Sequence, residues 1–271
     1  MESFNVEYDF VDLNNFDAVK SLVTEHTKLI YLETPSNPLL ELVDLKQISN
    51  LAKKFNLLTM ADNTFATPIN QRPIDFGIDI VVHSATKYLG GHSDITAGAV
   101  ATTKKLMQPI LLKARNFGGS LADHTTWLLE RSMKTLNLRV HQQSHNAMAI
   151  AEYLNQQDWV KQVFYPGIKT HHQHELAKMQ MSGYGGMLSF ELDQEIPANS
   201  FLGELKLIKD VLSLGGVETT ILSPAKTSHS LLSESERQAQ GITSQLLRLS
   251  RGIENHEDII NDIKQAVGKI I

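Results

Sequence analysis

The chain has 271 residues, of which 42% are hydrophobic and 20% are charged, and its formal net charge is −5. This composition is typical of a globular protein long enough for two domains, and the acidic balance argues against a protein that coats nucleic acid. The absence of cysteine excludes disulfides, thiolate metal sites and a cysteine nucleophile. No apolar run approaches the length of a membrane span, and the first residues lack a secretory signal pattern, so we expect a cytoplasmic protein without a membrane anchor.

The first hundred residues alternate between helical and strand patterns. We expect helices over Phe16–Thr24 and from Asp44 to Phe55, where Asp44 is a favourable N-cap. The expected strands are Lys28–Glu33, Leu57–Ala61, Ile78–Val82 and Gly98–Thr102. Strands that alternate with helices predict an α/β domain with a mostly parallel sheet and helices packed on both of its faces.

The second half has a different pattern. Residues Trp127–Tyr153 predict a long helical region, and Tyr165–Gly167 predicts a turn. The elements expected after the turn are a half-buried strand over Gly186–Leu192, a helix over Leu205–Leu212, a strand over Leu246–Ser250 and a closing helix over Glu257–Val267. We therefore predict a large domain over residues 1–138 and a smaller α+β domain over residues 139–271.

Polar residues follow three of the predicted strands. Glu33 and Asn37 follow the first, Asp62 and Asn63 the second, and Ser84, Thr86 and Lys87 the third. Ligands of such sheets bind outside the carboxyl ends of the strands, so we expect these residues to line one crevice.

Lys87 is the most informative of these residues. Burial at the end of a sheet lowers the pKa of a lysine, which makes its amine nucleophilic and able to form a Schiff base. Ser84 and Thr86 offer hydroxyl donors for a phosphate, and the Asp62 carboxylate could hold a protonated pyridine nitrogen. These are the groups that pyridoxal phosphate requires, although Ser-x-Thr-Lys alone is more often a solvated surface segment.

The order of the motifs strengthens this interpretation. Glu33–Pro38, Asp62–Pro68 and His83–Asp94 together resemble the Cys/Met-metabolism (trans-sulfuration) family of pyridoxal-phosphate-dependent enzymes. That family includes cystathionine γ-synthase, cystathionine lyases, methionine γ-lyase and O-acylhomoserine sulfhydrylases. Later segments also fit the family pattern: Leu136–Arg139, Tyr165–Gly167, Gly185–Phe190, Ser213–Glu218 and Leu247–Glu254.

The resemblance implies a role for each matching residue. Lys87 would bind pyridoxal 5'-phosphate as a Schiff base and move the substrate α-proton, and Asp62 would pair with the pyridine nitrogen. Ser84 and Thr86 would hold the phosphate. Asn37 would lie near the phenolic oxygen of the cofactor.

The substrate would be a free amino acid, a small molecule, and the resemblance implies which residues bind it. Arg248 would bind the substrate carboxylate as a bidentate fork, with Ser213 and Asn37 beside it. Taken without the motif, Arg248 is more often a strand-end arginine in a surface ion pair.

The implied fold is that of fold-type I pyridoxal-phosphate enzymes, and the implied assembly is a homodimer or homotetramer. The implied reaction is carbon–sulfur cleavage of cystathionine or methionine by β- or γ-elimination. Replacement at the γ-carbon, as in cystathionine γ-synthase or O-acetylhomoserine sulfhydrylase, is the alternative. Members of the family usually begin well before the position that matches Met1. We therefore also expect an N-terminally incomplete large domain with exposed sheet edges, and we keep open a non-catalytic remnant or a half-enzyme that needs an N-terminal partner.

Three other patterns point to different chemistry. Ser84–Lys87 satisfies the Ser-x-x-Lys pattern of penicillin-recognising enzymes, but it ends a strand where those enzymes begin a helix. His171–Glu175 is rich in histidine, as zinc sites are, but we interpret it as the solvated start of an exposed helix, with no metal. Gly183–Gly186 and Gly215–Gly216 fit no nucleotide-binding loop and are expected to be turns.

Overall fold

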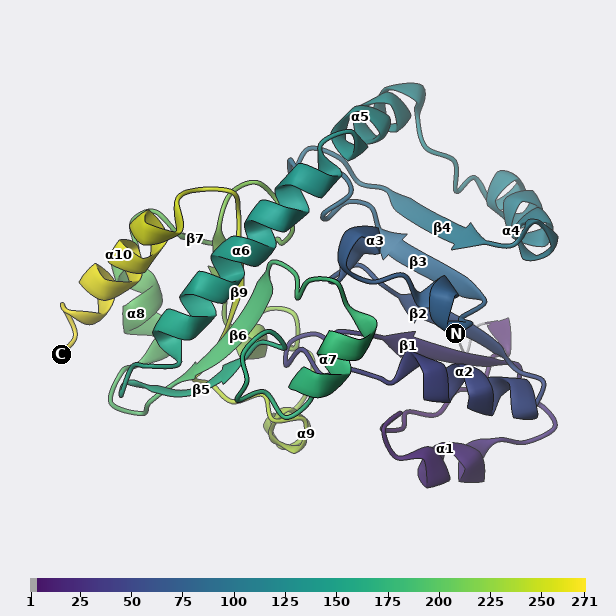
Figure 1. Cartoon of the computed structure of the whole chain (residues 1–271), viewed down its shortest axis with the longest axis horizontal. Helices are drawn as coiled ribbons and strands as arrows, with labels where there is room; N and C mark the ends of the chain where they lie inside the picture. Colours follow the sequence, from purple (N-terminus) through teal and green to yellow (C-terminus); the bar gives the residue numbers. More distant parts are fainter. Residues whose placement is uncertain (1–3) are drawn as a thin grey trace.

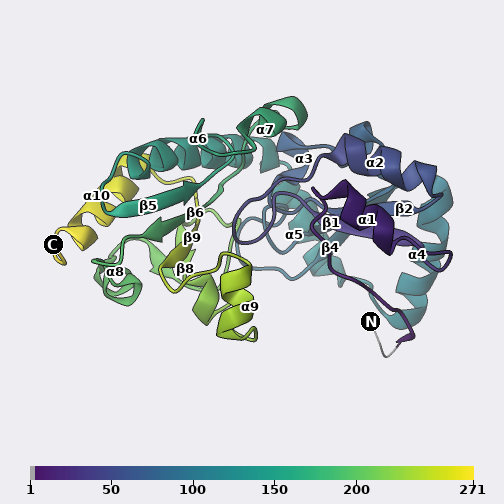
Figure 2. The same cartoon turned by 90° about the horizontal axis from the view of Figure 1, so that it is seen from below.

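The computed structural model describes residues 4–271 and contains two β-sheets that lie side by side (Figure 1). The long helix α6 (Leu136–Leu154) starts near the first sheet and crosses the second. Figure 2 shows the same two halves from below, with the purple start of the described chain on the side of the first sheet and the C-terminus at the far end of the second. Within residues 4–271, no helix is both long enough and apolar enough to cross a bilayer.

The first sheet has the strand order β1-β2-β3-β4. Its strands are β1 (Leu29–Glu33), β2 (Leu58–Asp62), β3 (Ile80–Ser84) and β4 (Gly98–Thr102). The first three strands are parallel, and β4 pairs with β3 in the antiparallel direction. All four predicted strands are confirmed within two residues, and the mostly parallel sheet is confirmed.

One face of this sheet packs on helices α1 (Phe16–Leu22) and α2 (Leu45–Lys54). The Asp44 side chain accepts a hydrogen bond from the amide of Gln47, which caps α2 as predicted. Along β1, buried and exposed residues alternate, and Tyr31 on the outward face is 55% exposed. Helix α4 (Lys104–Phe117) buries none of its residues. Helices therefore cover one face of this sheet and leave Tyr31 of β1 exposed on the other, whereas helices were expected on both faces.

The predicted helical region over Trp127–Tyr153 consists of two helices. Helix α5 (Asp123–Met133) has Lys134 as its C-cap, and α6 begins at Leu136. The predicted boundary between residues 138 and 139 falls inside α6 and stays a prediction. Two short helical turns complete the first half: α3 (Thr67–Asn70) and η2 (Pro73–Phe76).

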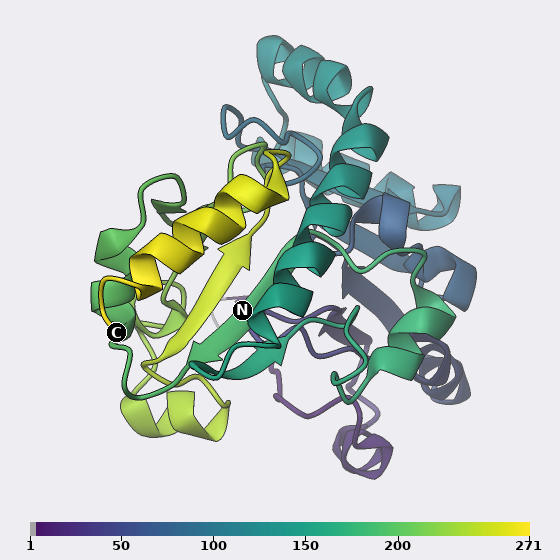
Figure 3. The same cartoon turned by 60° about the vertical axis from the view of Figure 1, so that its left-hand side comes forward.

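The second sheet has the order β5-β6-β9-β8-β7. Its strands are β5 (Val160–Phe164), β6 (Met187–Leu192), β7 (Lys209–Asp210), β8 (Thr220–Leu222) and β9 (Leu246–Ser250). Helices α6 and α10 (His256–Val267) run across one face of β6 and β9 (Figure 3). The remaining elements of this half are α7 (His174–Gln180), α8 (Ala198–Glu204), η3 (Pro224–Lys226) and α9 (Glu234–Ala239).

Two predictions for this half were wrong. Strand β6 is buried on both faces, because Leu188 and Phe190 face the helices while Met187 packs against the first half of the chain. The helix predicted over Leu205–Leu212 is absent, and these residues form an irregular segment followed by β7. The Asp262 carboxylate of α10 accepts hydrogen bonds from the amides of residues 206, 207 and 208, each at 2.9 Å, and so stabilises a non-helical turn.

Candidate active site

The carboxyl ends of the parallel strands bring the predicted residues together. Glu33 at the end of β1 lies opposite Asp62 at the end of β2. Thr64 links the next pair of strands, because its amide donates to Asp62 Oδ1 at 2.9 Å and its hydroxyl accepts from the Ser84 amide at 2.8 Å. The expected crevice at this edge of the sheet is therefore supported by the positions of all three strand ends.

Lys87 lies in a tight turn that follows β3. Its amide donates to the Ser84 carbonyl at 3.0 Å, and its own carbonyl accepts from the Gly91 amide at 2.7 Å. Burial lowers the pKa of the Lys87 amine, and the Arg248 guanidinium lowers it further. A lysine with a lowered pKa is the better nucleophile near neutral pH, because more of it is unprotonated.

The two hydroxyls beside Lys87 are in different states. The Thr86 hydroxyl donates to the Ala97 carbonyl at 3.2 Å and accepts from the Ala97 amide at 2.9 Å. It therefore pins the turn to the chain that leads into β4. Ser84 is bonded only through its own amide and carbonyl within residues 4–271. Of the two hydroxyls, that of Ser84 is therefore the one free to donate a hydrogen bond to a phosphate.

Asp62 influences the titration of its neighbours. The Glu33 side chain keeps solvent contact, but partial desolvation raises its pKa to about 7, Asp62 raises it further, and Arg248 opposes the shift. Burial lowers the pKa of His83, and Asp62 opposes that shift. Sequence reasoning noted Glu33 at the strand end without a role and overlooked His83, because nothing in the sequence shows which strand residues face Asp62.

Arg248 and Asn37 are in direct contact although 211 residues separate them. Arg248 lies on β9 and is 3% exposed, and its Nη1 donates to Asn37 Oδ1 at 2.9 Å. Desolvation lowers the pKa of Arg248 to about 10, and Tyr88 and Glu33 oppose the shift. Its Nε atom is buried without a hydrogen-bond partner in the part of the chain that the structure describes. The guanidinium therefore has an unused donor, and within residues 4–271 it forms no ion pair with an acidic side chain.

Ser213 approaches the lysine turn through its neighbour Gly215. Gly215 has φ +75°, and a Cβ at this position would lie 2.7 Å from the Tyr88 amide nitrogen and 3.0 Å from the Lys87 carbonyl carbon. Only glycine permits this approach. The Gly215 amide also donates to Ser250 Oγ at 2.8 Å, which ties the Ser213 segment to β9.

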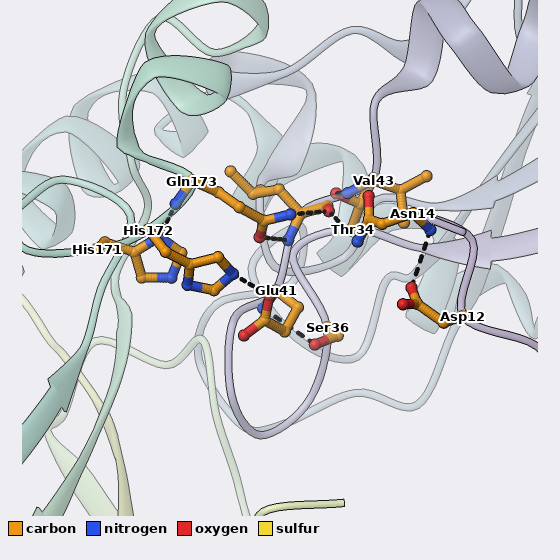
Figure 4. A network of polar contacts seen from close by, with 10 residues as sticks. Asp12, Asn14, Thr34, Ser36, Glu41, Val43, His171, His172 and Gln173 are labelled. Atoms are coloured by element: carbon orange, nitrogen blue, oxygen red, sulfur yellow. Dashed lines mark hydrogen bonds and ion pairs between the residues drawn. The ribbon is translucent and has the colours of Figure 1, made fainter. Parts of the chain in front are cut away.

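The loop that carries Asn37 is held by the second half of the chain (Figure 4). His172 Nε2 lies 2.9 Å from Glu41 Oε2, and the Gln173 side chain both donates to and accepts from the Leu42 backbone at 2.6 Å. On the other side, Ser189 Oγ of β6 donates to the Pro38 carbonyl at 2.7 Å. No local pattern predicted these contacts, because each joins segments more than 130 residues apart.

The histidine-rich segment leads into α7, as predicted, but it is only partly solvated. His171 is 6% exposed and stacks on His172 with ring centroids 4.9 Å apart. Burial lowers the pKa of His171 to about 4, and His172 and His174 add to the shift. Across residues 4–271, no group of three or more acidic, histidine or cysteine side chains could hold a metal ion.

The chemistry of the collected groups fits pyridoxal phosphate. The Lys87 amine has a lowered pKa, as a group that binds an aldehyde requires. The Asp62 carboxylate and the Ser84 hydroxyl end adjacent strands on the same side, where they could take the pyridine nitrogen and the phosphate. Arg248 and Asn37, which are bonded to each other, could bind the carboxylate of an amino acid.

Comparisons with known proteins agree with this chemistry. The chain is 49% identical over 263 residues to the cystathionine beta-lyase of Lactococcus lactis subsp. cremoris, a match that covers 97% of this chain and 69% of that protein. It is 45% identical over 271 residues to the L-methionine gamma-lyase of Fusobacterium nucleatum subsp. polymorphum, covering 98% and 69% of the two chains.

A solved structure of cystathionine gamma-lyase from Lactobacillus plantarum, complexed with L-serine, superimposes with a TM-score of 0.96 at 40% identity and covers 99% of this chain and 71% of that one. This likeness confirms the fold-type I expectation and the pyridoxal phosphate cofactor. The family model described as Cys/Met metabolism PLP-dependent enzyme matches residues 1–268. The chain belongs to the Cys/Met metabolism family of PLP-dependent enzymes.

Proposed function

We propose that this chain is a pyridoxal-phosphate-dependent carbon–sulfur lyase that cleaves cystathionine or methionine by β- or γ-elimination. The observation that carries the proposal is the contact between Arg248 and Asn37 beside the Lys87 turn, which supplies a carboxylate site next to a nucleophilic amine. The relatives named above, a cystathionine beta-lyase and an L-methionine gamma-lyase, support carbon–sulfur cleavage as the reaction.

The site residues have separate tasks in this mechanism, and Lys87 has two. Arg248 and Asn37 bind the substrate carboxylate and so orient the Cα–H bond towards Lys87. The Lys87 amine holds the cofactor before substrate arrives and then accepts the α-proton. The bound cofactor supplies an acceptor for the electron pair that the lost proton leaves behind. Asp62 keeps the ring nitrogen protonated and so strengthens that acceptor. The Ser84 hydroxyl anchors the phosphate, and the Thr86 hydroxyl joins it by giving up its bond to the Ala97 carbonyl.

The test begins with cofactor attachment. The purified chain is mixed with pyridoxal phosphate, its visible absorbance is recorded, and borohydride reduction is followed by peptide mapping. We expect a yellow protein with the adduct on Lys87, no adduct in Lys87→Arg, and an unchanged adduct in the exposed control Lys113→Arg. A folded chain that takes up no cofactor would favour the alternative of a half-enzyme or a non-catalytic protein.

The second step separates elimination from replacement. With cystathionine or methionine, a lyase releases ammonia and a 2-oxo acid in equal amounts. With O-acetylhomoserine and a thiol, a replacement enzyme forms a thioether and releases no ammonia. Thioether formation without ammonia would favour the alternative of γ-replacement.

The assembly and the location are inferred from the family. A homodimer or homotetramer agrees with the resemblance, and light scattering of the cofactor-loaded protein tests it. A cytoplasmic location is likewise a prediction, which fractionation of the source cells tests.

A further inference from the structure

One face of helix α6 carries three buried polar side chains. Arg139 is 5% exposed, and Gln143 and Asn146 are 0% exposed. Their spacing of four and three residues places them on one side of the helix. Long polar side chains are seldom buried to this extent unless their donors are satisfied, so the partners of this stripe show what it does.

Arg139 bonds to the backbone of the lysine turn. Its Nη1 donates to the Tyr88 carbonyl at 2.8 Å, and its Nη2 donates to the Ser132 carbonyl at 3.0 Å. It has no carboxylate partner among the described residues. Gly91 has φ +71°, and a Cβ there would collide with Arg139 Nη1, so the turn is shaped around the guanidinium.

Gln143 and Asn146 bond to two other backbone segments. Gln143 Nε2 donates to the Gly216 carbonyl at 2.7 Å. Asn146 Nδ2 donates to the carbonyls of Gly252 at 3.1 Å and Glu254 at 2.8 Å. On these segments the three side chains hydrogen-bond only to backbone carbonyls. They therefore fix where the backbone lies, whatever side chains the segments carry.

The three segments are those that carry the site. Tyr88 follows Lys87, Gly216 lies three residues after Ser213, and Gly252 lies four residues after Arg248. A single helix therefore bonds to the Lys87 turn and to both proposed substrate-binding segments. Side chains fixed to one rigid helix preserve a spacing that three separate loops would not.

From this geometry we infer that Arg139, Gln143 and Asn146 are positioning residues. Arg139 sets the Lys87 amine, whereas Gln143 and Asn146 set Ser213 and Arg248. The inference rests on the proposed function, because it assigns the three segments to one active site. The inference makes a distinctive prediction. Substitution of Arg139 should change the reactivity of Lys87 and leave carboxylate binding unchanged, whereas substitution of Gln143 or Asn146 should do the reverse.

The experiment uses the near-isosteric variants Arg139→Met, Gln143→Met and Asn146→Leu, with Arg139→Lys as the conservative variant. Gln156→Met is the matched control, because Gln156 is exposed just beyond α6. Three quantities are measured: the melting temperature, the labelling rate of Lys87 by an acetic anhydride pulse in the cofactor-free chain, and the dissociation constant of L-serine in the loaded chain.

We expect Arg139→Met to change the Lys87 labelling rate about 10-fold, with L-serine binding within about 2-fold of the unmodified chain. Gln143→Met and Asn146→Leu should weaken L-serine binding about 10-fold and leave the labelling rate within about 2-fold. Arg139→Lys should recover part of the labelling rate. If Arg139→Met does not fold, the labelling rate of Arg139→Lys is compared with that of the unmodified chain instead. That rate should still change, because one ammonium cannot bond to both carbonyls as the guanidinium does.

Two results would overturn the inference. One is a set of variants in which both quantities move in parallel with the melting temperature, as a purely structural role requires. The other is a set of folded variants in which neither quantity moves. Failure of the unmodified chain to attach pyridoxal phosphate at Lys87 would count against the proposed function instead, since the labelling rate is measured without the cofactor.

Discussion

His171 makes the stability of this chain depend on pH, and replacing it with Asn isolates the effect. Its ring is 6% exposed, and burial lowers its pKa from 6.5 to about 4. The unfolded chain therefore takes up a proton at higher pH than the folded chain does. The contribution of the neutral His171 ring to the free energy of unfolding is complete above about pH 6.5 and is lost as the pH falls towards 4.

The size of this effect follows from the shift. Lowering the pKa from 6.5 to about 4 corresponds to about 3 kcal/mol, of which about 2 kcal/mol falls between pH 7.5 and pH 4.5. His171 Nδ1 accepts a hydrogen bond from the Gln173 amide at 3.2 Å, and the Asn oxygen of the variant can preserve that bond. His171→Asn should consequently leave stability near pH 7.5 within about 1 kcal/mol of the unmodified chain.

The assay is urea unfolding, measured from pH 7.5 down to pH 4.5. We expect the free energy of unfolding of the unmodified chain to fall about 2 kcal/mol further than that of His171→Asn over this range. His26→Asn is the matched control, because His26 has an exposed side chain, and its curve should follow the unmodified chain. Parallel curves for His171→Asn and the unmodified chain would refute the reasoning.

Three further predictions concern other residues. Arg248→Lys keeps the charge but loses the planar fork, so KM for the amino-acid substrate should rise roughly 10- to 100-fold, and an unchanged KM would remove Arg248 from the carboxylate site. Asp262→Ala leaves three backbone amides without their acceptor and should lower the free energy of unfolding by about 3 kcal/mol in chemical denaturation, whereas a loss below about 1 kcal/mol would contradict this account. Gly91→Ala should lower the melting temperature more than Gly118→Ala, since both glycines have positive φ but only Gly91 faces Arg139; equal losses would show that the guanidinium yields freely.

Much of the first half could be predicted from the sequence. The strands of the first sheet are short apolar runs that end in polar residues, and parallel strands place those residues at one edge. Lys87, Asp62 and Ser84 follow from that rule. Their individual roles stay predictions, because strand order does not fix where each side chain points.

The second half was harder to predict because its structure depends on distant partners. The segment Leu205–Leu212 has helical spacing, but Asp262 of α10 binds its amides and prevents the helix. Strand β6 alternates in sequence, yet the first half of the chain covers the face that the pattern assigns to solvent. The side-chain bonds of Gln173 and Asn146 likewise depend on tertiary neighbours that no local pattern records.

The loop that carries Asn37 has a mechanical consequence for the molecule. Its neck is closed within the first half, where the Val43 amide donates to Thr34 Oγ1 at 3.0 Å, while its tip is bonded to Ser189 and Arg248 of the second half. In any hinge motion between the halves, the tip of the loop and residues 41–42 would travel with the second half, because both are bonded to it. Because α6 bonds both to the Lys87 turn and to the segment after Arg248, Asn37 would keep its distance to both residues, and the movement would fall on the Thr34 side of the loop.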